Sequence, residues 1–249
     1  MIDKKYETYQ AFCREAVDTP LWNVFRQVPR YTYVLEHVSP EQGKAYLAEV
    51  HPRYLTPDLL EVWRASDSVG SPLLAEFEGI GKFSPTTIRY LKQLSDIEGL
   101  FGRDTFSSVV EVGGGYGGLA RVLLNRMQGI QRYNLVDLLE ANCVAEKFLA
   151  SFPETDGRVV HQDTAARPSG TADLFISNYA LAELEPYYRD HYLDVALKCP
   201  RGYVAVNAAQ QVVAEKLAPL RPQMFPEPPL ISQQGNFFTL VWGHDASAR

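Results

Sequence analysis

The sequence contains no long hydrophobic run, few cysteines and no excess of basic residues. No window approaches the roughly 18 consecutive apolar residues of a membrane-spanning helix, so we predict no membrane span. The N-terminal residues are charged and lack the apolar segment of a signal peptide. The three cysteines, Cys13, Cys143 and Cys199, are far apart and follow no metal-ligand spacing. We therefore expect reduced thiols in a cytoplasmic protein.

The chain is mildly acidic, with a formal net charge of -6 and a pI of about 5.4. Electrostatic repulsion disfavours nucleic acid and anionic membranes as partners. No spacing of His, Asp or Glu identifies a metal site, so we assign no metal ligands. The expected partner is a small molecule or a glycan, and the sequence leaves a homodimer open.

Residues 1–100 are predicted to form a helical N-terminal cap that helps to bind the substrate. Apolar side chains recur there at spacings of three and four, as on one face of an amphipathic helix. This face consists of Tyr6, Tyr9, Phe12 and Ala16. Ser39 and Ser84 each precede a proline, which is typical of an N-cap followed by the first helical residue. Helices are therefore predicted over 40–50, from 57 through 63, and from 85 to about 99–102.

Residues 101–249 alternate between short β-rich runs and helical windows. Strands are predicted at 109–112, 133–136, 158–161, 173–177 and 203–207, and helices at 119–127, 140–152 and 186–197. This alternation predicts an α/β domain with a mostly parallel sheet covered on both faces. A late strand over 235–242 is predicted to complete the sheet as an antiparallel edge strand. Residues 222–229 contain four prolines and are predicted to form a loop.

A glycine-rich turn follows the first strand of this domain and opens a helix. Five of the six residues 113–118 are glycine, which lets the backbone bend sharply and approach a ligand closely. The turn has no lysine, which argues against a nucleoside triphosphate loop. A dinucleotide and S-adenosylmethionine (SAM) both fit the spacing. Glu111 favours SAM, because a carboxylate there attracts the ammonium of the methionine part and repels a pyrophosphate.

Polar side chains at the ends of the next strands complete the predicted cofactor site. Asp137 can accept both ribose hydroxyls, or cap the following helix. Asp163 can accept a hydrogen bond from an adenine amino group, or cap a loop. Asn178 and Tyr179 are expected to contact the methionine end, and the Tyr116 ring to close the pocket. The full predicted set is Glu111, Gly113, Gly115, Tyr116, Gly117, Asp137, Leu138, Asp163, Thr164, Asn178 and Tyr179.

These motifs resemble those of class I SAM-dependent methyltransferases and, more narrowly, of bacterial sugar O-methyltransferases. The matching segments are 83–91, 111–118, 135–138 and 177–184, within less than half of the chain. The family usually carries Gly-Asn-Pro before the Ser-Pro helix, where this chain has Gly-Ile-Gly-Lys at 79–82. The resemblance implies a Rossmann-like class I methyltransferase sheet, SAM as cofactor, and methyl transfer to a sugar hydroxyl on a nucleotide sugar or glycan terminus.

Methyl transfer to a sugar hydroxyl requires a proton acceptor, because the hydroxyl has a high pKa. Glu183, five residues after Asn178, and His161, at the end of the third strand, are the candidates. Glu183 is alternatively a solvent-side or capping residue, and His161 alternatively flanks the adenine.

The family-like segment also predicts residues that contact the acceptor. They are Glu78, Ser84, Thr87 and Arg89. Arg89 would hold a nucleotide phosphate or a sugar acid, or would instead pair with Asp96 or Glu98. Two other functions stay open: a methyltransferase with a non-sugar small-molecule acceptor, and a non-catalytic SAM-fold module that binds a partner.

Overall fold

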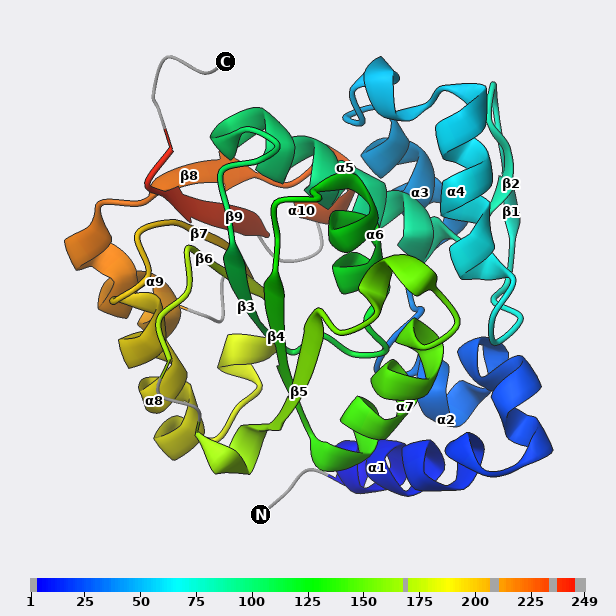
Figure 1. Ribbon diagram of the computed structural model, residues 1–249, viewed down its shortest axis with the longest axis horizontal. Helices are drawn as coiled ribbons and strands as arrows, with labels where there is room; N and C mark the ends of the chain where they lie inside the picture. Colours follow the sequence, from blue (N-terminus) through cyan, green and yellow to red (C-terminus); the bar gives the residue numbers. More distant parts are fainter. Residues whose placement is uncertain (1–3, 168–169, 207–210, 233–236, 245–249) are drawn as a thin grey trace.

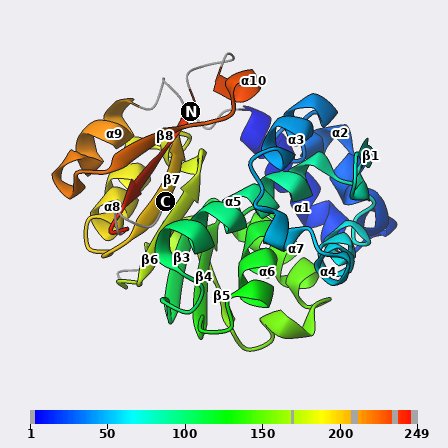
Figure 2. The same cartoon turned by 90° about the horizontal axis from the view of Figure 1, so that it is seen from above.

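The chain folds into an α/β structure in which a seven-stranded sheet is covered by helices on both faces (Figures 1 and 2). The computed structural model describes residues 4–167, 170–206, 211–232 and 237–244. The strand order is β5-β4-β3-β6-β7-β9-β8. Every pairing is parallel except those of β9, which runs antiparallel to β7 and β8. The predicted mostly parallel α/β sheet with a reversed C-terminal strand is confirmed.

The sheet and its helices follow the predicted alternation. The strands are β3 (Ser108–Val112), β4 (Arg132–Asp137), β5 (Val159–Asp163), β6 (Leu174–Asn178), β7 (Gly202–Val206), β8 (Gln223–Pro226) and β9 (Phe238–Trp242). One face is covered by α5 (Pro85–Phe101), α6 (Gly118–Arg126) and α7 (Leu139–Leu149). The other face is covered by α8 (Pro186–Ala196) and α9 (Gln211–Leu217). Buried apolar side chains on the two faces form two separate clusters.

The N-terminal region is mostly helical and packs outside α5, α6 and α7 (Figure 2). It contains α1 (Lys4–Val17), η1 (Pro20–Gln27), α2 (Pro29–Thr32), α3 (Pro40–Leu47), η2 (Pro52–Tyr54), α4 (Pro57–Asp67) and a hairpin of β1 (Ala75–Phe77) and β2 (Gly81–Phe83). Phe12, Tyr31 and Trp63 are fully buried in the same cluster as the α5–α7 face of the sheet. The N-terminal helices and the sheet therefore share one hydrophobic core.

The two predicted N-caps are confirmed. Ser39 and Gln42 form a capping box, in which Ser39 Oγ accepts from the Gln42 amide at 3.2 Å. Ser84 Oγ accepts from the Thr86 amide at 3.2 Å, and Pro85 is the first residue of α5. Gly102, with a φ of 86°, ends α5 in a conformation that favours glycine. The sequence signals thus fix the start of the helix that later carries several site residues.

The C-terminal part of the chain departs from the prediction in two places. Residues 223–226, predicted as loop because of the prolines, form the edge strand β8. Pro226 ends that strand, and an edge strand tolerates a residue without an amide N–H. The predicted edge strand β9 instead lies between β7 and β8. The predicted boundaries at Asn207 and Gly235 lie outside the described residues.

The hairpin of β1 and β2 was not predicted, because strands of three residues carry too short a pattern to recognise. Three further short elements, η3 (Pro153–Thr155), η4 (Thr164–Ala166) and η5 (Ala180–Ala182), follow strands or helices of the sheet domain. The chain also forms η7 (Ala218–Leu220) and α10 (Pro229–Ser232) before β9. Within the described ranges, no helix combines the length and the apolar character that crossing a membrane requires.

Candidate functional site

The glycine-rich turn lies where the strand order of the sheet reverses. From β3 the chain proceeds to β4 on one side, whereas β6 pairs with β3 on the other side. Ligands of open α/β sheets bind outside the carboxyl ends of the strands at such a point. Gly113, Gly115 and Gly117 in the turn have positive φ angles of 81°, 57° and 82°. The glycines therefore allow a backbone path that other residues rarely adopt.

The turn is also packed too closely for side chains. A Cβ atom on Gly113 would lie 2.1 Å from the Ala180 Cβ, and one on Gly117 would lie 2.8 Å from Leu149 Cδ1. A Cβ on Gly115 would lie 2.8 Å from Leu35 Cδ1. Leu35 belongs to the N-terminal region, so that region covers the turn directly.

Glu111 lies on β3, two residues before Gly113, and its carboxyl group is buried. It is only 2% exposed, and its Oε2 accepts a hydrogen bond from the Tyr133 hydroxyl at 2.8 Å. Burial raises the pKa of Glu111 to about 7, against the hydrogen bonds from Tyr133 and Asn178. Burial favours the neutral acid in the free protein, so the carboxylate form needs a partner that replaces water.

Asp137, the last residue of β4, is folded back onto the turn. Its Oδ2 accepts from the Gly115 amide and its Oδ1 from the Leu138 amide, both at 2.7 Å. Burial raises the pKa of Asp137 to about 6 despite these two hydrogen bonds. In the part of the chain that the structure describes, no Lys or Arg forms an ion pair with Asp137 or Glu111. The turn therefore carries two acidic groups without a cationic protein partner.

The amides of the turn are largely engaged within the protein. Gly113 N donates to the Val136 carbonyl at 2.8 Å, and Gly117 N donates to the Gly114 carbonyl at 3.0 Å. Gly115 N donates to Asp137. A turn that binds a phosphate presents its free amides to the anion. This turn presents carboxylates instead, which favours a cationic or hydroxyl-bearing ligand.

The end of β6 lies beside the turn and beside α5. Gln93 Nε2 on α5 donates to the Asn178 side-chain oxygen at 2.9 Å. Tyr179 then adopts a φ of 67°, which is uncommon for an aromatic residue, while its amide donates to the Ala205 carbonyl at 2.9 Å. This bend places Ala180 against Gly113. Backbone strain of this kind often occurs at functional sites.

Helix α1 crosses the carboxyl end of the sheet beside α7 (Figure 1). The Tyr6 hydroxyl donates to Glu183, and Gln10 Nε2 donates to Glu140 on α7 at 3.2 Å. Arg14 pairs with the same Glu140 at 3.1 Å. Glu183 is exposed, but its charge contributes to the raised pKa of Asp137, so it lies at the rim of the same site. Polar contacts therefore hold α1 over the turn.

The structure separates His161 from the turn. His161 lies on β5, and both β4 and β3 stand between β5 and β6. At a strand spacing of about 4.8 Å, His161 is roughly 14 Å from the strand that ends in Asn178. We therefore withdraw His161 as a general base. Burial also lowers the pKa of His161.

Among the described residues, no three His, Cys, Asp or Glu side chains are grouped so that they could hold a metal ion.

The residues after β5 are engaged in local contacts. Asp163 is level with Asp137 in the parallel register, and its Oδ1 accepts from the Ala165 amide at 2.9 Å. The loop-cap alternative is thus observed, and the adenine contact stays a prediction. Thr164 is buried, and its carbonyl accepts from the Tyr192 hydroxyl at 2.7 Å.

The Tyr116 ring does not close the pocket as predicted. It is fully buried, with its centroid 4.8 Å from that of Phe148, and the Arg26 guanidinium lies 4.6 Å above it. The ring therefore anchors the glycine turn to the N-terminal region, because its apolar faces are more stable in this aromatic cluster than beside a solvated ligand.

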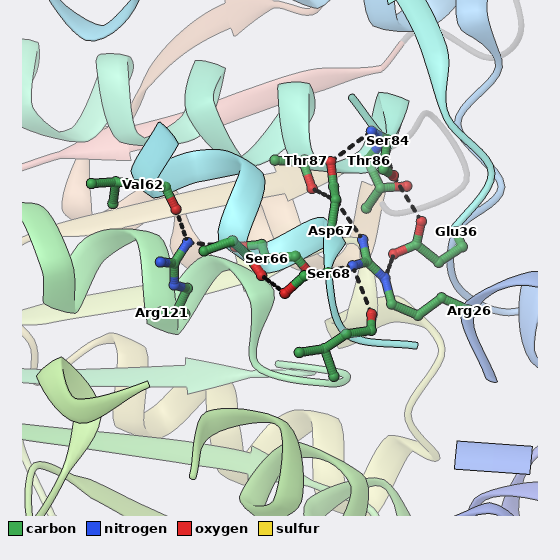
Figure 3. A network of polar contacts seen from close by, with 12 residues as sticks. Arg26, Glu36, Val62, Ser66, Asp67, Ser68, Ser84, Thr86, Thr87 and Arg121 are labelled. Carbon is green, nitrogen blue, oxygen red and sulfur yellow. Dashed lines mark hydrogen bonds and ion pairs between the residues drawn. The ribbon is translucent and has the colours of Figure 1, made fainter. Parts of the chain in front are cut away.

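Ser84 and Thr87 are bonded within a buried network (Figure 3). Ser84 Oγ donates to Glu36 at 3.0 Å, and Thr87 Oγ1 donates to Asp67 at 2.7 Å. Arg26 pairs with both acids, at 2.7 Å to Glu36 and 3.3 Å to Asp67. These contacts stabilise the start of α5, so we no longer assign Ser84 and Thr87 to the acceptor.

Glu78 is also withdrawn from the acceptor set. It is exposed in the turn between β1 and β2, and this hairpin lies at the outer edge of the N-terminal region, away from β3 (Figures 1 and 2). Arg89, in contrast, is buried on α5. It forms neither of the alternative ion pairs: Asp96 pairs with Lys92, and the partners of Glu98 are Arg53, Arg103 and Arg126.

Two residues of the site were missed from the sequence. Gln93 follows Arg89 by one helical turn, and that spacing on a helix that begins with a clear cap was the available signal. Tyr6 was predicted only as part of an apolar helix face. Its contact with Glu183 joins residues 177 positions apart, and no local pattern reports such a contact.

No protein-family model matches the chain, and no curated protein matches it. Among solved structures, it is similar to the mitomycin 7-O-methyltransferase MmcR, with 15% identity, 87% of this chain and 72% of the other covered, and a TM-score of 0.46. The pyocyanin biosynthetic protein PhzM shows 13% identity, coverage of 97% and 70%, and a TM-score of 0.44. A SAM-dependent methyltransferase from Aquifex aeolicus shows 15% identity, with 61% of this chain and 95% of the other covered, and a TM-score of 0.41. Similarity this low supports no conclusion about function.

Proposed function

We propose that the protein is a SAM-dependent methyltransferase that transfers a methyl group to a hydroxyl of a small molecule. One observation carries this proposal. Glu111 and Asp137 lie at the glycine turn without a Lys or Arg partner among the described residues, and most amides of the turn are already hydrogen-bonded within the protein. SAM carries an ammonium, a sulfonium and a ribose diol. All three are groups that a carboxylate attracts by charge or accepts hydrogen bonds from.

A dinucleotide fits this site less well. Its pyrophosphate would face Glu111 and Asp137 instead of cations, and the Gly115 amide that it would need already donates to Asp137. Placing like charges together in a partly buried site costs free energy. The charge of the site therefore favours SAM over a nicotinamide or flavin dinucleotide.

The residues of the turn have distinct proposed roles. Asp137 accepts hydrogen bonds from the ribose hydroxyls, and Glu111 attracts the ammonium of the methionine part. Asn178, held by Gln93 at 2.9 Å, lines the same end of the site. When bound, SAM supplies an electrophilic methyl group. Leu35 lies against the turn and Tyr6 of α1 bonds Glu183 at its rim. Methyl transfer requires that the acceptor be aligned with this methyl group.

We propose Glu183 as the group that accepts the proton of the acceptor hydroxyl. It lies at the rim of the site, next to the acidic Asp137, and is held there by Tyr6. The variant Glu183→Gln should keep cofactor binding and lose methyl transfer by about 100-fold, within the range of general-base catalysis. Its neighbour Glu185→Gln, also exposed, is the control. Equal activity of the two variants would remove Glu183 from this role.

A sugar hydroxyl is the acceptor that we propose. Two observations support it: the resemblance of segments 83–91 and 177–184 to sugar O-methyltransferases, and the tyrosine hydroxyls of Tyr46 and Tyr179 close to Arg89. Hydroxyl and guanidinium groups are the donors that recognise polyhydroxylated ligands. A nucleotide sugar and a glycan terminus both present such hydroxyls.

Calorimetric titration with S-adenosylhomocysteine tests the cofactor site. The wild-type protein should bind with a Kd in the micromolar range or tighter, and Asp137→Ala should weaken binding by about 10- to 100-fold, as expected for a lost charge-assisted hydrogen bond. Asp156→Ala, an exposed aspartate outside the site, should bind as the wild type does. Absence of binding by folded wild-type protein would overturn the proposal.

A further inference from the structure

One face of α5 carries three buried polar atoms without a hydrogen-bond partner. They are Thr86 Oγ1, Arg89 Nε and Gln93 Oε1. Spacings of three and four residues place these side chains on the same side of a helix. Buried polar atoms are almost always satisfied in native proteins, so a row of three unsatisfied ones indicates that this face binds something.

Arg89 is the charged member of this row. It is only 7% exposed, and within the described part of the chain no carboxylate forms an ion pair with it. The two other buried arginines do have such partners: Arg26 pairs with Glu36 at 2.7 Å, and Arg121 pairs with Glu154 at 3.3 Å. An unpaired buried charge is expensive, so Arg89 requires an anion that the protein itself does not supply.

Three tyrosine side chains lie near Arg89. They are Tyr46 on α3, Tyr90 on α5 and Tyr179 after β6. All three raise the pKa of Arg89, and Tyr90 also forms a hydrogen bond with it. Tyrosine hydroxyls add hydrogen bonds to an anion held by a guanidinium without adding charge at neutral pH. The group is therefore built from one cation and several neutral donors.

Arg89 lies next to the proposed methyl-transfer site. Gln93, one turn further along α5, donates to Asn178 at the carboxyl end of β6, and Tyr179 follows Asn178 directly. The acceptor must approach the cofactor at this end of the sheet. An anion bound by Arg89 would thus belong to the acceptor.

We infer that Arg89 binds a carboxylate of the acceptor, which makes the acceptor a hydroxy acid such as a sugar acid. This inference rests on the proposed function and names the substrate class within it. A guanidinium and a carboxylate can pair through two parallel hydrogen bonds and neutralise each other.

The acids near Arg89 favour a carboxylate over a phosphate. The charge of Glu227 helps to raise the pKa of both Tyr46 and Tyr179, so Glu227 lies near them. Lys92 Nζ forms ion pairs with Glu227 at 3.7 Å and with Asp96 at 2.9 Å. Thr239 Oγ1 also donates to Glu227 at 2.8 Å. The single positive charge of Lys92 is therefore already paired with two carboxylates. Arg89 is left as the cation that can neutralise the ligand. One positive charge matches a carboxylate, whereas a phosphate monoester or pyrophosphate brings more negative charge.

Nuclear magnetic resonance of the arginine Nε–H groups tests this inference, with formate as the smallest carboxylate probe. The Arg89 signal is identified by its loss in Arg89→Met. In protein saturated with S-adenosylhomocysteine, formate should shift this signal saturably at millimolar concentration, and phosphate should shift it less. The exposed Arg30 is the internal control. No shift by formate, a stronger response to phosphate, or an equal shift of Arg30 would each overturn the assignment.

Thermal unfolding separates ligand binding from a structural role. Arg89→Met removes an unpaired charge, so its melting temperature should equal or exceed that of the wild type. Arg121→Met removes the partner of Glu154 and should melt lower. An equal fall in both variants would assign Arg89 to the fold. Retained binding of S-adenosylhomocysteine, with no formate response, would overturn this inference and leave the proposed function intact.

Discussion

Glu111 and Asp137 couple ligand binding to protonation. The pKa of Glu111 is raised from 4.5 to about 7, and that of Asp137 from 3.8 to about 6. The folded protein therefore binds protons that the unfolded chain has released, and its stability falls as the pH rises through these values. The positive charge of a bound ligand lowers the pKa of both groups, because it stabilises their ionised forms. Binding of such a ligand therefore releases protons.

The affinity for S-adenosylhomocysteine should therefore rise with pH. If only ionised Glu111 binds the ammonium, its pKa of about 7 implies that the Kd falls about tenfold from pH 6 to pH 8. Calorimetry in buffers with different ionisation enthalpies should show proton release at pH 6.5 or so. Glu111→Gln should bind more weakly and with little change over this range. An unchanged wild-type Kd from pH 6 to pH 8 would show that Glu111 does not contact the ligand's charge.

The residues that the sequence could predict are those next to a recognisable local pattern. Glu111 adjoins the glycine turn and Asp137 ends a strand, so both were predicted and both lie at the turn. His161 ends the predicted strand 158–161, although β5 runs on to Asp163. Its distance from Asn178 depends on the strand order, which no local pattern encodes. The role of Ser84 was misjudged because its partner Glu36 is 48 positions away.

At the scale of elements, the glycine turn is predicted to be intolerant of a side chain. Gly113 and Gly157 have similar φ angles, 81° and 66°, but only Gly113 has a close neighbour. Gly157→Ala should cost about 1 kcal/mol, the strain of the left-handed conformation. Gly113→Ala should cost about 1–3 kcal/mol more, because the added Cβ meets Ala180. Urea unfolding measures both, and equal losses would show that Ala180 moves freely.

Elements were predictable where one signal dominated. The Ser-Pro starts of α3 and α5 are such signals, since the serine caps the helix and the proline fits its first turn. β8 was missed because its prolines suggest a loop, and only the pairing with β9 makes the segment a strand. The order of β9 and β8 likewise depends on tertiary pairing and not on local propensity.

At the scale of the whole molecule, a buried polar network joins the N-terminal region to the sheet domain (Figure 3). Arg26 is 1% exposed and pairs with Glu36 and Asp67, while Ser84 and Thr87 at the start of α5 donate to these acids. The same guanidinium lies over Tyr116 in the glycine turn. One charge thus connects the cap, the helix that carries Arg89, and the turn.

Removing that charge should loosen the connection between the two regions. Arg26→Met would leave Glu36 and Asp67 buried together without a cation, which costs about 3–5 kcal/mol for a broken buried ion pair. Arg30→Met, whose exposed pair with Glu15 is 3.0 Å long, should cost less than about 1 kcal/mol. Chemical unfolding followed by circular dichroism measures both losses. Because Tyr116 packs on Arg26, the Arg26 variant should also bind S-adenosylhomocysteine more weakly. A large loss of stability with unchanged binding would instead show that the cap and the cofactor turn are energetically independent.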